Sequence, residues 1–427
     1  MGRRDREEAE AILAKVTGIS IDPDSTQEGV MAALEVYQKG KALVPKRTKH
    51  NVTVILERDT RWAGRIWANE LDGLIYKDAK PITDEDMEIL YEWIYLHYDL
   101  HASETHIERA IRLVAHRNRR HPIREYLQGL TWDGTPRLGR WLANYCGASV
   151  APLIGRIGTC WAISAVARVM DPGCKVHTCL IFKSGQGSGK SSTFELMAIR
   201  EEWFSDSDID MGSKDKYQSI QGVWIYELAE LSSIRKAENT AVKSFITSRK
   251  DRYRPAFDRF TRVQPRQTIF VGTTNEEAFL TDPSGSRRFW PVTVGRIDQA
   301  GLLKVRDQLW AEAVHRYDAG EQWWLTDSEE EQLRIHNSQY RQADIWEDAV
   351  ETWASKRAAP FTQAELMEDA LGREMKHANG RDEIRTRSIL QALGYETRQM
   401  RLNGRKARWW FRGSYRGSEW GTAGAAE

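Results

Sequence analysis

The sequence is poor in cysteine, and the few cysteines it has show no metal-binding or disulfide pattern. They are Cys146, Cys160, Cys174 and Cys179. None has Cys-x-x-Cys spacing and no histidine cluster lies nearby, which argues against a zinc site and against a disulfide framework. We therefore expect reduced thiols in the core of a cytoplasmic protein.

The sequence also lacks net charge and long apolar runs. Lys and Arg number 62 and Asp and Glu number 61, a formal net charge of +1, so any nucleic-acid surface has to be local. No uninterrupted apolar segment has the length of a membrane span, and the charged N-terminus MGRRDREEAEAILAKV is unlike a secretion signal. We expect no membrane partner. The length of 427 residues allows about three domains.

The most informative segment is Val176–Ser192, with the sequence VHTCLIFKSGQGSGKSS. Its apolar start predicts a short buried strand, and apolar residues at helical spacing follow from Ser191 to Ile199. The glycines between them let backbone N–H groups converge on phosphate oxygens, and the helix N-terminus adds a positive partial charge. A strand, a glycine-rich turn and a helix in this order predict a phosphate-binding loop; the alternative is a Gly/Ser-rich surface turn.

This loop predicts binding of ATP with Mg²⁺. Lys190 would reach the β/γ-phosphates, and the Ser191 hydroxyl would bind the metal ion. One position departs from the usual pattern, because Ser184 stands where the first glycine is expected. The predicted nucleotide-binding residues are Gly185, Gln186, Gly187, Ser188, Gly189, Lys190, Ser191 and Ser192.

Two later segments predict buried strands that end in polar residues. Gly222–Glu227 (GVWIYE) ends in a carboxylate that would hold Mg²⁺ and its water, although a surface acid is the alternative. Either Glu230 folds back as the general base or Glu227 performs both tasks. Gln267–Asn275 (QTIFVGTTN) ends in an asparagine that would orient the attacking water or sense the γ-phosphate, unless it only forms a turn.

Two adjacent arginines, Arg287 and Arg288, follow the flexible turn 282–286 (DPSGS) and precede another predicted strand. Guanidinium groups stabilise the charge that develops in phosphoryl transfer, and they are often supplied by a neighbouring subunit. Surface ion pairs are the alternative interpretation.

Two basic segments are candidate nucleic-acid surfaces. Residues 243–262 interleave cations with aromatic rings, as in surfaces that bind single strands, and a solvated charged face explains the composition equally well. Residues 385–393 predict a helix, and 395–413 predict a basic hairpin with Asn403 and Gly404 at its turn. Helices followed by such a hairpin are similar to a winged helix-turn-helix. The candidate contacts are Lys243, Lys250, Arg252, Arg254, Arg405, Lys406 and Arg408.

The remaining segments predict helices and one small β unit. Residues 1–45 predict one or two helices, and NVTVILERD at 51–59 predicts a strand that opens the β unit. Thr83 begins a helix, another covers 104–119, and a strongly apolar helix at 153–170 would pack on the nucleotide-binding sheet.

Taken together, these motifs resemble the virulence-associated protein E family, ATPases of phages and mobile elements that are similar to superfamily-three helicases with an AAA+ core. The matching segments are NVTVILERD, HPIREYLQGLTWDG, SGQGSGKSS, VWIYELAEL, VKSFITSRKDRYR, GTTN and GSRRFWPV. They span about 51–346, most of the chain.

The resemblance implies an α/β fold with an AAA+ P-loop core. The implied organisation is a helical segment at 1–50, an α+β collar at 51–150, the ATPase core at 151–300, a helical lid at 301–350 and a winged-helix-like domain at 351–427. It assigns the Walker A pair to Lys190 and Ser191, the Walker B acids to Glu227 and Glu230, the sensor to Asn275, and the arginine fingers to Arg287 and Arg288. Lys243, Asp251 and Arg254 match a further motif of superfamily-three helicases.

The leading hypothesis is therefore an ATP-driven DNA helicase or translocase that forms a ring, often a hexamer, and acts in phage or mobile-element replication in a bacterial host. One alternative is a DNA-binding assembly factor that binds nucleotide without robust hydrolysis, and a less favoured one is a P-loop kinase. Relatives often carry a primase-like domain for which residues 1–50 are too short, so a separate primase is a candidate partner.

Overall fold

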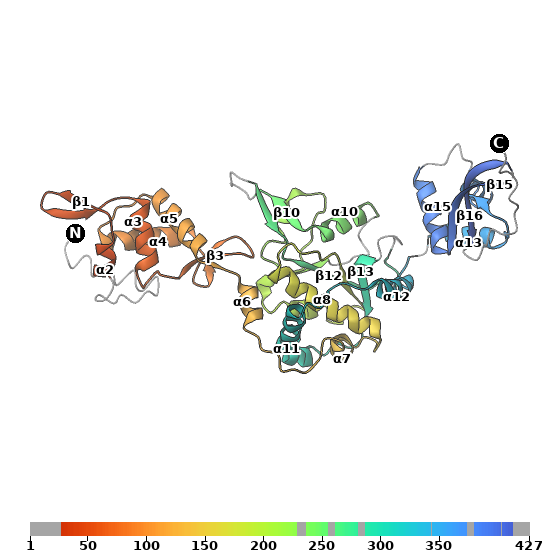
Figure 1. Ribbon diagram of the computed structural model, residues 1–427, viewed down its shortest axis with the longest axis horizontal. Coiled ribbons are helices and arrows are strands. Elements are labelled where there is room, and N and C mark those ends of the chain that lie inside the picture. Colours follow the sequence, from red (N-terminus) through yellow and green to blue (C-terminus); the bar gives the residue numbers. More distant parts are fainter. Residues whose placement is uncertain are drawn as a thin grey trace.

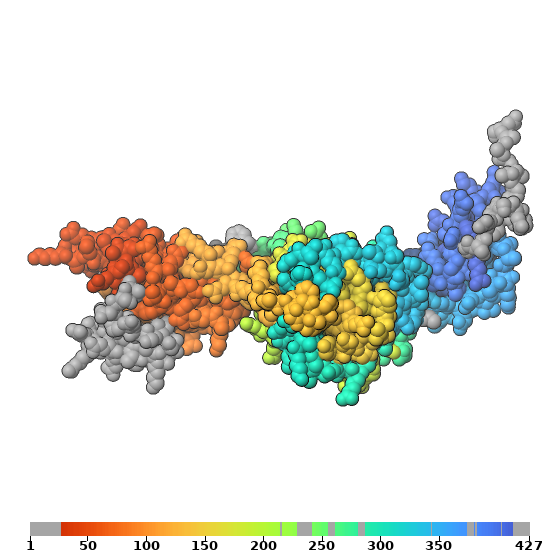
Figure 2. Space-filling model, turned by 60° about the horizontal axis from the view of Figure 1, so that its bottom comes forward, coloured from red at the N-terminus to blue at the C-terminus, as the bar shows by residue number. Residues whose placement is uncertain are grey.

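The computed structural model describes residues 27–228, 236–254, 261–280, 287–342, 344–373, 380–402 and 404–412. Figure 1 shows an N-terminal unit, a central unit and a C-terminal unit in chain order, and Figure 2 shows the same elongated outline from another side. Each unit has a hydrophobic cluster of its own, and the central unit has one on each face of its sheet.

The N-terminal unit packs helices against a small sheet. Its helices are α2 (Gln27–Ala32), α3 (Lys49–Arg58), α4 (Asp84–Tyr98) and α5 (Glu104–Arg117). Its strands are β1 (Val36–Lys39), β2 (Ala42–Pro45), β3 (Ile66–Asn69), β4 (Ile75–Lys77), β5 (Lys80–Pro81) and β6 (Arg119–Arg120). The β1–β2 hairpin is separate from the four-stranded sheet, whose order is β5-β4-β3-β6.

Two predictions for this unit are wrong. NVTVILERD forms helix α3 and no strand, because the Thr48 side chain caps the helix and its apolar residues also fit a helical spacing that buries them fully. The end of the predicted N-terminal helical segment forms the β1–β2 hairpin, with Gly40 in the left-handed region at φ 64°. The rest of that segment, residues 1–26, lies outside the described residues. The helix predicted at Thr83 is confirmed as α4, with Thr83 and Asp86 in a capping box.

The central unit is built on a five-stranded sheet in which all neighbouring strands are parallel, in the order β13-β7-β12-β9-β8. The strands are β7 (Cys179–Lys183), β8 (Phe204–Ser205), β9 (Ile225–Leu228), β12 (Ile269–Thr274) and β13 (Phe289–Thr293). Strands β10 (Lys250–Tyr253) and β11 (Arg262–Pro265) form a separate antiparallel pair. The helices are α6 (Pro122–Gln128), α7 (Trp141–Cys146), α8 (Pro152–Met170), α9 (Lys190–Met197), α10 (Lys236–Thr247), α11 (Gln299–Asp318) and α12 (Asp327–Ser338), with short 3₁₀ turns at Glu201–Trp203 and Lys214–Tyr217.

Helices cover both faces of this sheet, which explains why its strands are continuous apolar runs without alternation. All six residues of β12 are buried. On one face, the Trp310 ring of α11 lies 4.6 Å from the ring of Trp224 and 5.8 Å from that of Trp161 on α8. On the other face, Phe245 of α10 packs 5.3 Å from Phe270. The strands predicted around residues 179, 225, 269 and 289 are confirmed.

Helix α8 is the central helix of this core. Within the described part of the chain it alone is long and apolar enough to cross a membrane, and 78% of its apolar window is buried inside the protein. Arg168, which interrupts the apolar run, is buried and donates to the carbonyl oxygen of Val176 at 2.7 Å. Burial lowers the pKa of Arg168 to about 10. The helix predicted at 153–170 is therefore confirmed, and the guanidinium of its arginine donates to backbone carbonyl oxygens inside the fold.

The end of the matching motif HPIREYLQGLTWDG and the residues that follow it are held against α11 by hydrogen bonds. Gln308 donates to the carbonyl oxygen of Thr131 at 3.0 Å, and the buried Glu312 accepts from the Leu138 backbone at 2.9 Å. Leu302, Leu309 and Trp310 of α11 share one hydrophobic cluster with the sheet. This motif thus has a structural role, and α11 packs as part of the core.

All four cysteines are free and buried, which confirms the predicted core thiols. Burial raises the pKa of Cys146 and of Cys160 to about 12 and that of Cys174 to about 11. These thiols are therefore protonated and unreactive near neutral pH.

The C-terminal unit contains helices followed by a long hairpin. Its elements are α13 (Glu347–Ser355), β14 (Phe361–Thr362), α14 (Gln363–Asp369), α15 (Gly380–Ala392), β15 (Tyr395–Leu402) and β16 (Arg405–Arg412). Strand β16 pairs with both β14 and β15 in an antiparallel sheet around a core that includes Phe361, Leu390 and Trp410. The predicted helix at 385–393 and the hairpin are confirmed, whereas the predicted turn residue Asn403 lies outside the described residues.

Close packing at the start of α8 gives a stability prediction. A Cβ added at Gly155 would overlap the carbonyl oxygen of Gly139, which belongs to the backbone and has little room to move. We expect Gly155→Ala to lower the free energy of unfolding by about 1–3 kcal/mol, although alanine is ordinarily the better helix former.

The matched control is Gly29→Ala in α2, where an added Cβ meets no atom within 4 Å. This change should leave stability unchanged or raise it by up to about 1 kcal/mol. Urea denaturation of both variants tests the packing, and equal stability of the two would contradict it.

Candidate functional site

Polar residues lie at or just after the ends of three neighbouring parallel strands, at the carboxyl edge of the central sheet. Strand β12 lies between β7 and β9, with Thr274 opposite Lys183 and Gly272 opposite Leu228. The loop after β7, the end of β9 and the residue after β12 are therefore neighbours. In open parallel α/β sheets, ligands bind outside this edge of the strands.

The loop between β7 and α9 has the backbone that its glycines predict. Gly187 and Gly189 have φ of 75° and 80°, which favour glycine, and α9 begins at the next residue, Lys190. Gln299, at the start of α11, donates to the Gly189 carbonyl oxygen at 3.0 Å. The loop is therefore fixed from α11 as well as from its own strand and helix, a contact that the sequence did not predict.

Ser184, the departure from the usual pattern, fits this loop without backbone strain. It is not among the described non-glycine residues with positive φ, which are Asp78, Asp99 and Ile199. Its hydroxyl group contacts that of Ser188 and lies 3.3 Å from Lys190 Nζ. A Cβ is accommodated here, and the hydroxyl adds a contact across the loop that glycine could not make.

The Lys190 ammonium joins the loop to the end of β12. Lys190 is 8% exposed, and its Nζ donates to Asn275 Oδ1 at 2.7 Å and to the carbonyl oxygens of Gly185 at 3.0 Å and Ser184 at 3.1 Å. Burial lowers the pKa of Lys190, and the nearby Glu227 carboxylate opposes that shift. Two residues that the sequence proposed for separate roles, Lys190 and Asn275, thus lie in direct contact.

Glu227 is the buried acid of the site and is 1% exposed. Its Oε1 accepts a hydrogen bond from Ser191 Oγ at 2.9 Å and another from Thr273 Oγ1. Its Oε2 is buried without a hydrogen-bond partner within the described residues. Burial raises the pKa of Glu227, and the two hydroxyl groups lower it in part. Sequence reasoning missed Thr273, although the GTTN segment places it two residues before Asn275.

This donor set fits a magnesium ion held together with phosphate groups. Ser191 and Glu227 would supply oxygen ligands to such an ion, and Glu227 Oε2 has no hydrogen-bond partner within the described residues. Mg²⁺ takes one or two protein oxygens and completes its shell with phosphate oxygens and water. Within the described residues no cluster of three or more His, Cys, Asp or Glu side chains could hold a metal by itself, and this kind of site does not require one.

The two adjacent arginines lie at the opposite edge of the sheet. Phe289 pairs with Cys179 at the amino end of β7, so Arg288 precedes that level by one residue. About 20 Å of strand length separates it from the loop after β7. Arg287 is exposed, with Nη1 3.9 Å from Glu330 Oε2, and Arg288 Nε is buried without a partner among the described residues. In this chain, the structure therefore does not bring them to Lys190.

His177, just before β7, lies near the cations of this edge. Burial, the largest cause, and the nearby cations Lys175, Arg287 and Arg288 together lower the pKa of His177 to about 4. The second predicted acid, Glu230, lies outside the described residues.

The predicted cations at 243–254 lie on two elements. Lys250, Arg252 and Arg254 are exposed along β10 and just after it, while Lys243 is half-buried on α10. Asp251 alternates inward and is buried, with its carboxylate bound by Arg266, whose guanidinium lies 4.5 Å over the Phe245 ring. Asp251 therefore anchors the hairpin, and its cationic neighbours face outward.

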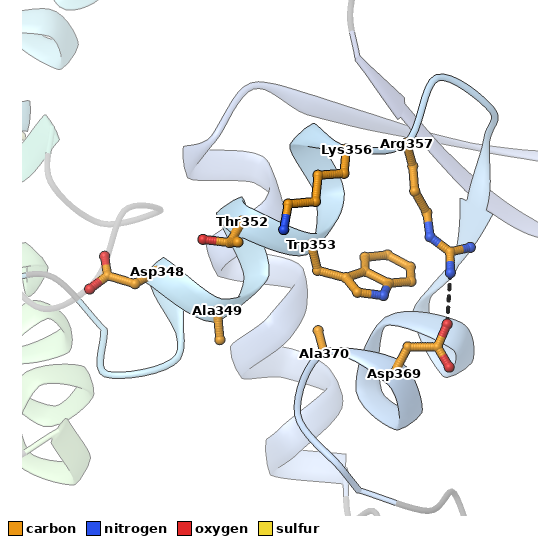
Figure 3. A pocket seen from close by; sticks show the side chains of 8 residues that line it. All are labelled: Asp348, Ala349, Thr352, Trp353, Lys356, Arg357, Asp369 and Ala370. Atoms are coloured by element: carbon orange, nitrogen blue, oxygen red, sulfur yellow. Dashed lines mark hydrogen bonds and ion pairs between the residues drawn. The ribbon is translucent and has the colours of Figure 1, made fainter.

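The C-terminal unit holds a cavity of about 700 Å³ that is separate from this site. Figure 3 shows Trp353 and Lys356 at the end of α13 and Arg357 paired with Asp369 of α14. The Arg357 guanidinium lies 4.0 Å over the Trp353 ring and 2.7 Å from Asp369 Oδ2. Through Arg357, these contacts join α13 to α14. The cavity therefore lies between elements that pack within one unit.

The burial of Glu227 gives a pH-dependent prediction. The folded protein binds the proton of the Glu227 carboxyl group more tightly than the unfolded chain does. The protonated carboxyl group therefore favours the folded state at low pH, and this stabilisation is lost as pH rises from about 4.5 through the raised pKa. Glu227→Gln keeps an acceptor for both hydroxyl groups without the buried charge. We expect it to raise the free energy of unfolding of the nucleotide-free protein by on the order of 1 kcal/mol near pH 8, a Tm gain of about 2–4 °C.

Thermal unfolding from about pH 5 to pH 8 measures this effect, and the difference from the parent should grow with pH. The exposed Glu195→Gln on α9 is the control and should match the parent at every pH. A Tm difference for Glu227→Gln that is negative or independent of pH would refute the interpretation.

Known proteins that are similar to this chain include one family and several solved structures. The model of the virulence-associated protein E-like domain matches residues 127–342, just over half of the chain. Among solved structures, the chain is similar to the apo NrS-1 C terminal region (305–718), with 12% identity, a TM-score of 0.46, and coverage of 81% of this chain and 95% of that one. An A form apo structure of that region gives 13% identity at the same TM-score of 0.46. None of the curated proteins compared with the chain matches it. The chain belongs to the virulence-associated protein E-like family.

Proposed function

We propose that this protein is an ATP-driven DNA helicase or translocase that assembles as a head-to-tail ring, hexameric by family resemblance, and acts in phage or mobile-element replication in the cytoplasm of a bacterial host. The observation that carries the proposal is the meeting of Lys190, Ser191, Glu227 and Asn275 at the carboxyl edge of the parallel sheet. The position of the loop between β7 and α9 supports a P-loop core of the AAA+ type.

Each residue of the site has a role that follows from its position. Lys190 neutralises phosphate charge, and Asn275, which contacts its ammonium at 2.7 Å, orients the attacking water. Ser191 and Glu227 hold Mg²⁺, which supplies charge neutralisation at the β- and γ-phosphates when it is bound. Thr273 fixes the Glu227 carboxylate in the orientation that this task needs.

The two edges of the sheet support a site composed of two subunits. Arg287 and Arg288 precede β13 at the amino edge of the sheet, too far from the loop of their own chain to serve it. In a head-to-tail ring the amino edge of one subunit meets the carboxyl edge of the next, so a neighbour's arginines reach the phosphates.

The C-terminal unit supports a winged helix-turn-helix that contacts DNA through its hairpin. Helices α13, α14 and α15 precede β15–β16, and β14 pairs along β16. On α15, Arg385 is held by Asp344 at 2.7 Å and lies 3.9 Å over the Trp346 ring, which removes it from the free cations. The exposed cations of the hairpin, none with an ion pair among the described residues, are Arg398, Arg401, Arg405, Lys406, Arg408 and Arg412.

The first test is ATP turnover with and without single-stranded DNA. DNA should stimulate hydrolysis by the parent, whereas Lys190→Ala should abolish it, because the phosphate charge is then uncompensated. The control is Lys175→Ala, an exposed lysine before β7 that should retain turnover.

Turnover by Lys190→Ala near the parent rate would exclude the assigned site. Nucleotide binding and ring formation with negligible turnover would favour the assembly factor, and turnover indifferent to DNA would favour the kinase.

The composite site gives a second prediction. Lys190→Ala subunits have a defective loop and intact arginines, while Arg287→Ala/Arg288→Ala subunits have the reverse, so each variant alone should be inactive. In an equal random mixture about a quarter of the interfaces pair an intact loop with intact arginines, and part of the ATPase activity should return.

Native mass spectrometry confirms mixed rings before turnover is measured. Activity of the arginine double variant by itself would rule out the finger role. Mixed rings without recovered turnover would count against composite sites, unless turnover requires several adjacent intact interfaces.

A further inference from the structure

The β1–β2 hairpin concentrates positive charge in a chain that is otherwise nearly neutral. Four residue pairs join its strands, from Val36 with Pro45 to Lys39 with Ala42. Residues 35–50, EVYQKGKALVPKRTKH, contain five lysines and arginines and one glutamate, against a net charge of +1 for the whole protein. Figure 1 shows the hairpin projecting from the N-terminal unit, on the side away from the central unit.

These cations are not neutralised within the described part of the chain. Lys39, Lys41, Arg47 and Lys49 are exposed and form no ion pair there. Lys46 Nζ lies 3.8 Å from Glu35 Oε2, but both side chains are about half exposed, at 49% and 48%, so this pair contributes little. The hairpin therefore presents a positive surface to solvent.

The base of the hairpin is fixed to the fold. Asn51 of α3 is fully buried, and its Oδ1 accepts from the Glu35 backbone N–H at 2.8 Å. Its Nδ2 donates to the carbonyl oxygens of Glu35 at 2.7 Å and Lys46 at 2.9 Å. One side chain thus holds both ends of the hairpin, and its outer face is positioned before any partner binds.

The hairpin also carries exposed apolar side chains. Leu43 is 70% exposed, Tyr37 41% and Val36 37%. Tyr37 and Lys39 lie on the same face of β1, about 7 Å apart along the strand. Single-stranded nucleic acid binds to basic surfaces that also carry aromatic side chains. Its phosphates contact the cations, and a base stacks on the aromatic ring.

We propose that the β1–β2 hairpin is a binding site for single-stranded nucleic acid, separate from the contacts on β10 and on β15–β16. It uses Lys39 and Lys41 for phosphates and the Tyr37 ring for a base. The site goes beyond the proposed function, which places DNA contacts on the C-terminal hairpin, and it rests on that function for the class of ligand.

The test measures binding of fluorescein-labelled oligothymidylate to the full chain by anisotropy, at salt concentrations from about 50 to 200 mM. Lys39→Gln/Lys41→Gln removes two phosphate contacts, so the slope of log K against log salt should become less steep by about 1.4. Tyr37→Ala should weaken binding at least about fivefold with the slope unchanged, because stacking releases no counterions. Tyr37→Phe retains the ring and should bind as the parent does.

The matched control is Lys80→Gln/Arg109→Gln, which removes the same charge from exposed positions on β5 and α5 of the same unit. Thermal unfolding confirms that every variant is folded. Hairpin variants with the affinity and slope of the control would overturn this proposal and leave the surface to an acidic protein partner.

A variant of the C-terminal hairpin separates the two hypotheses. If Arg405→Gln/Lys406→Gln weakens binding while the β1–β2 variants do not, only the present inference fails. If the parent itself binds no oligonucleotide, the proposed function fails with it.

Discussion

The buried carboxylate of Glu227 is the constraint on which the arrangement of the site depends. A carboxylate that is 1% exposed requires partners, and Ser191 from α9 and Thr273 from β12 supply hydroxyl groups to one of its oxygens. These contacts fix the start of α9 against the ends of β9 and β12. The second oxygen has no hydrogen-bond partner within the described residues. An unsatisfied buried acceptor is unfavourable, and a bound cation would relieve this cost.

The sheet also separates the parts of the proposed catalytic site. Its parallel strands place the loop, Glu227 and Asn275 at one edge and Arg287 with Arg288 at the other. If these arginines serve the proposed site, strand direction requires that a neighbouring subunit supply them. The cations proposed for DNA lie instead on antiparallel hairpins outside this sheet.

Local sequence patterns predicted the central unit well because its signals are strong. Short apolar runs bounded by turn residues or polar residues are consistent with buried parallel strands, which these segments form. The strand prediction for NVTVILERD is wrong because the spacing of its apolar residues fits both a strand and a helix. The Thr48 cap and packing against α5 stabilise the helix α3. Contacts such as Lys190 with Asn275 depend on strand order, which no local pattern contains.

Whether Ser191 and Glu227 hold a metal ion with the nucleotide is tested by the affinity of the full chain for a fluorescent ATP analogue, measured in Mg²⁺ and in EDTA for the parent and for Ser191→Ala. We expect EDTA to weaken binding by the parent at least about tenfold, because in the proposed site Ser191 and Glu227 bind nucleotide through the metal ion. Ser191→Ala should bind weakly in Mg²⁺ and change little in EDTA. Equal affinity of the parent in both conditions, or an unchanged metal dependence in Ser191→Ala, would exclude this metal site.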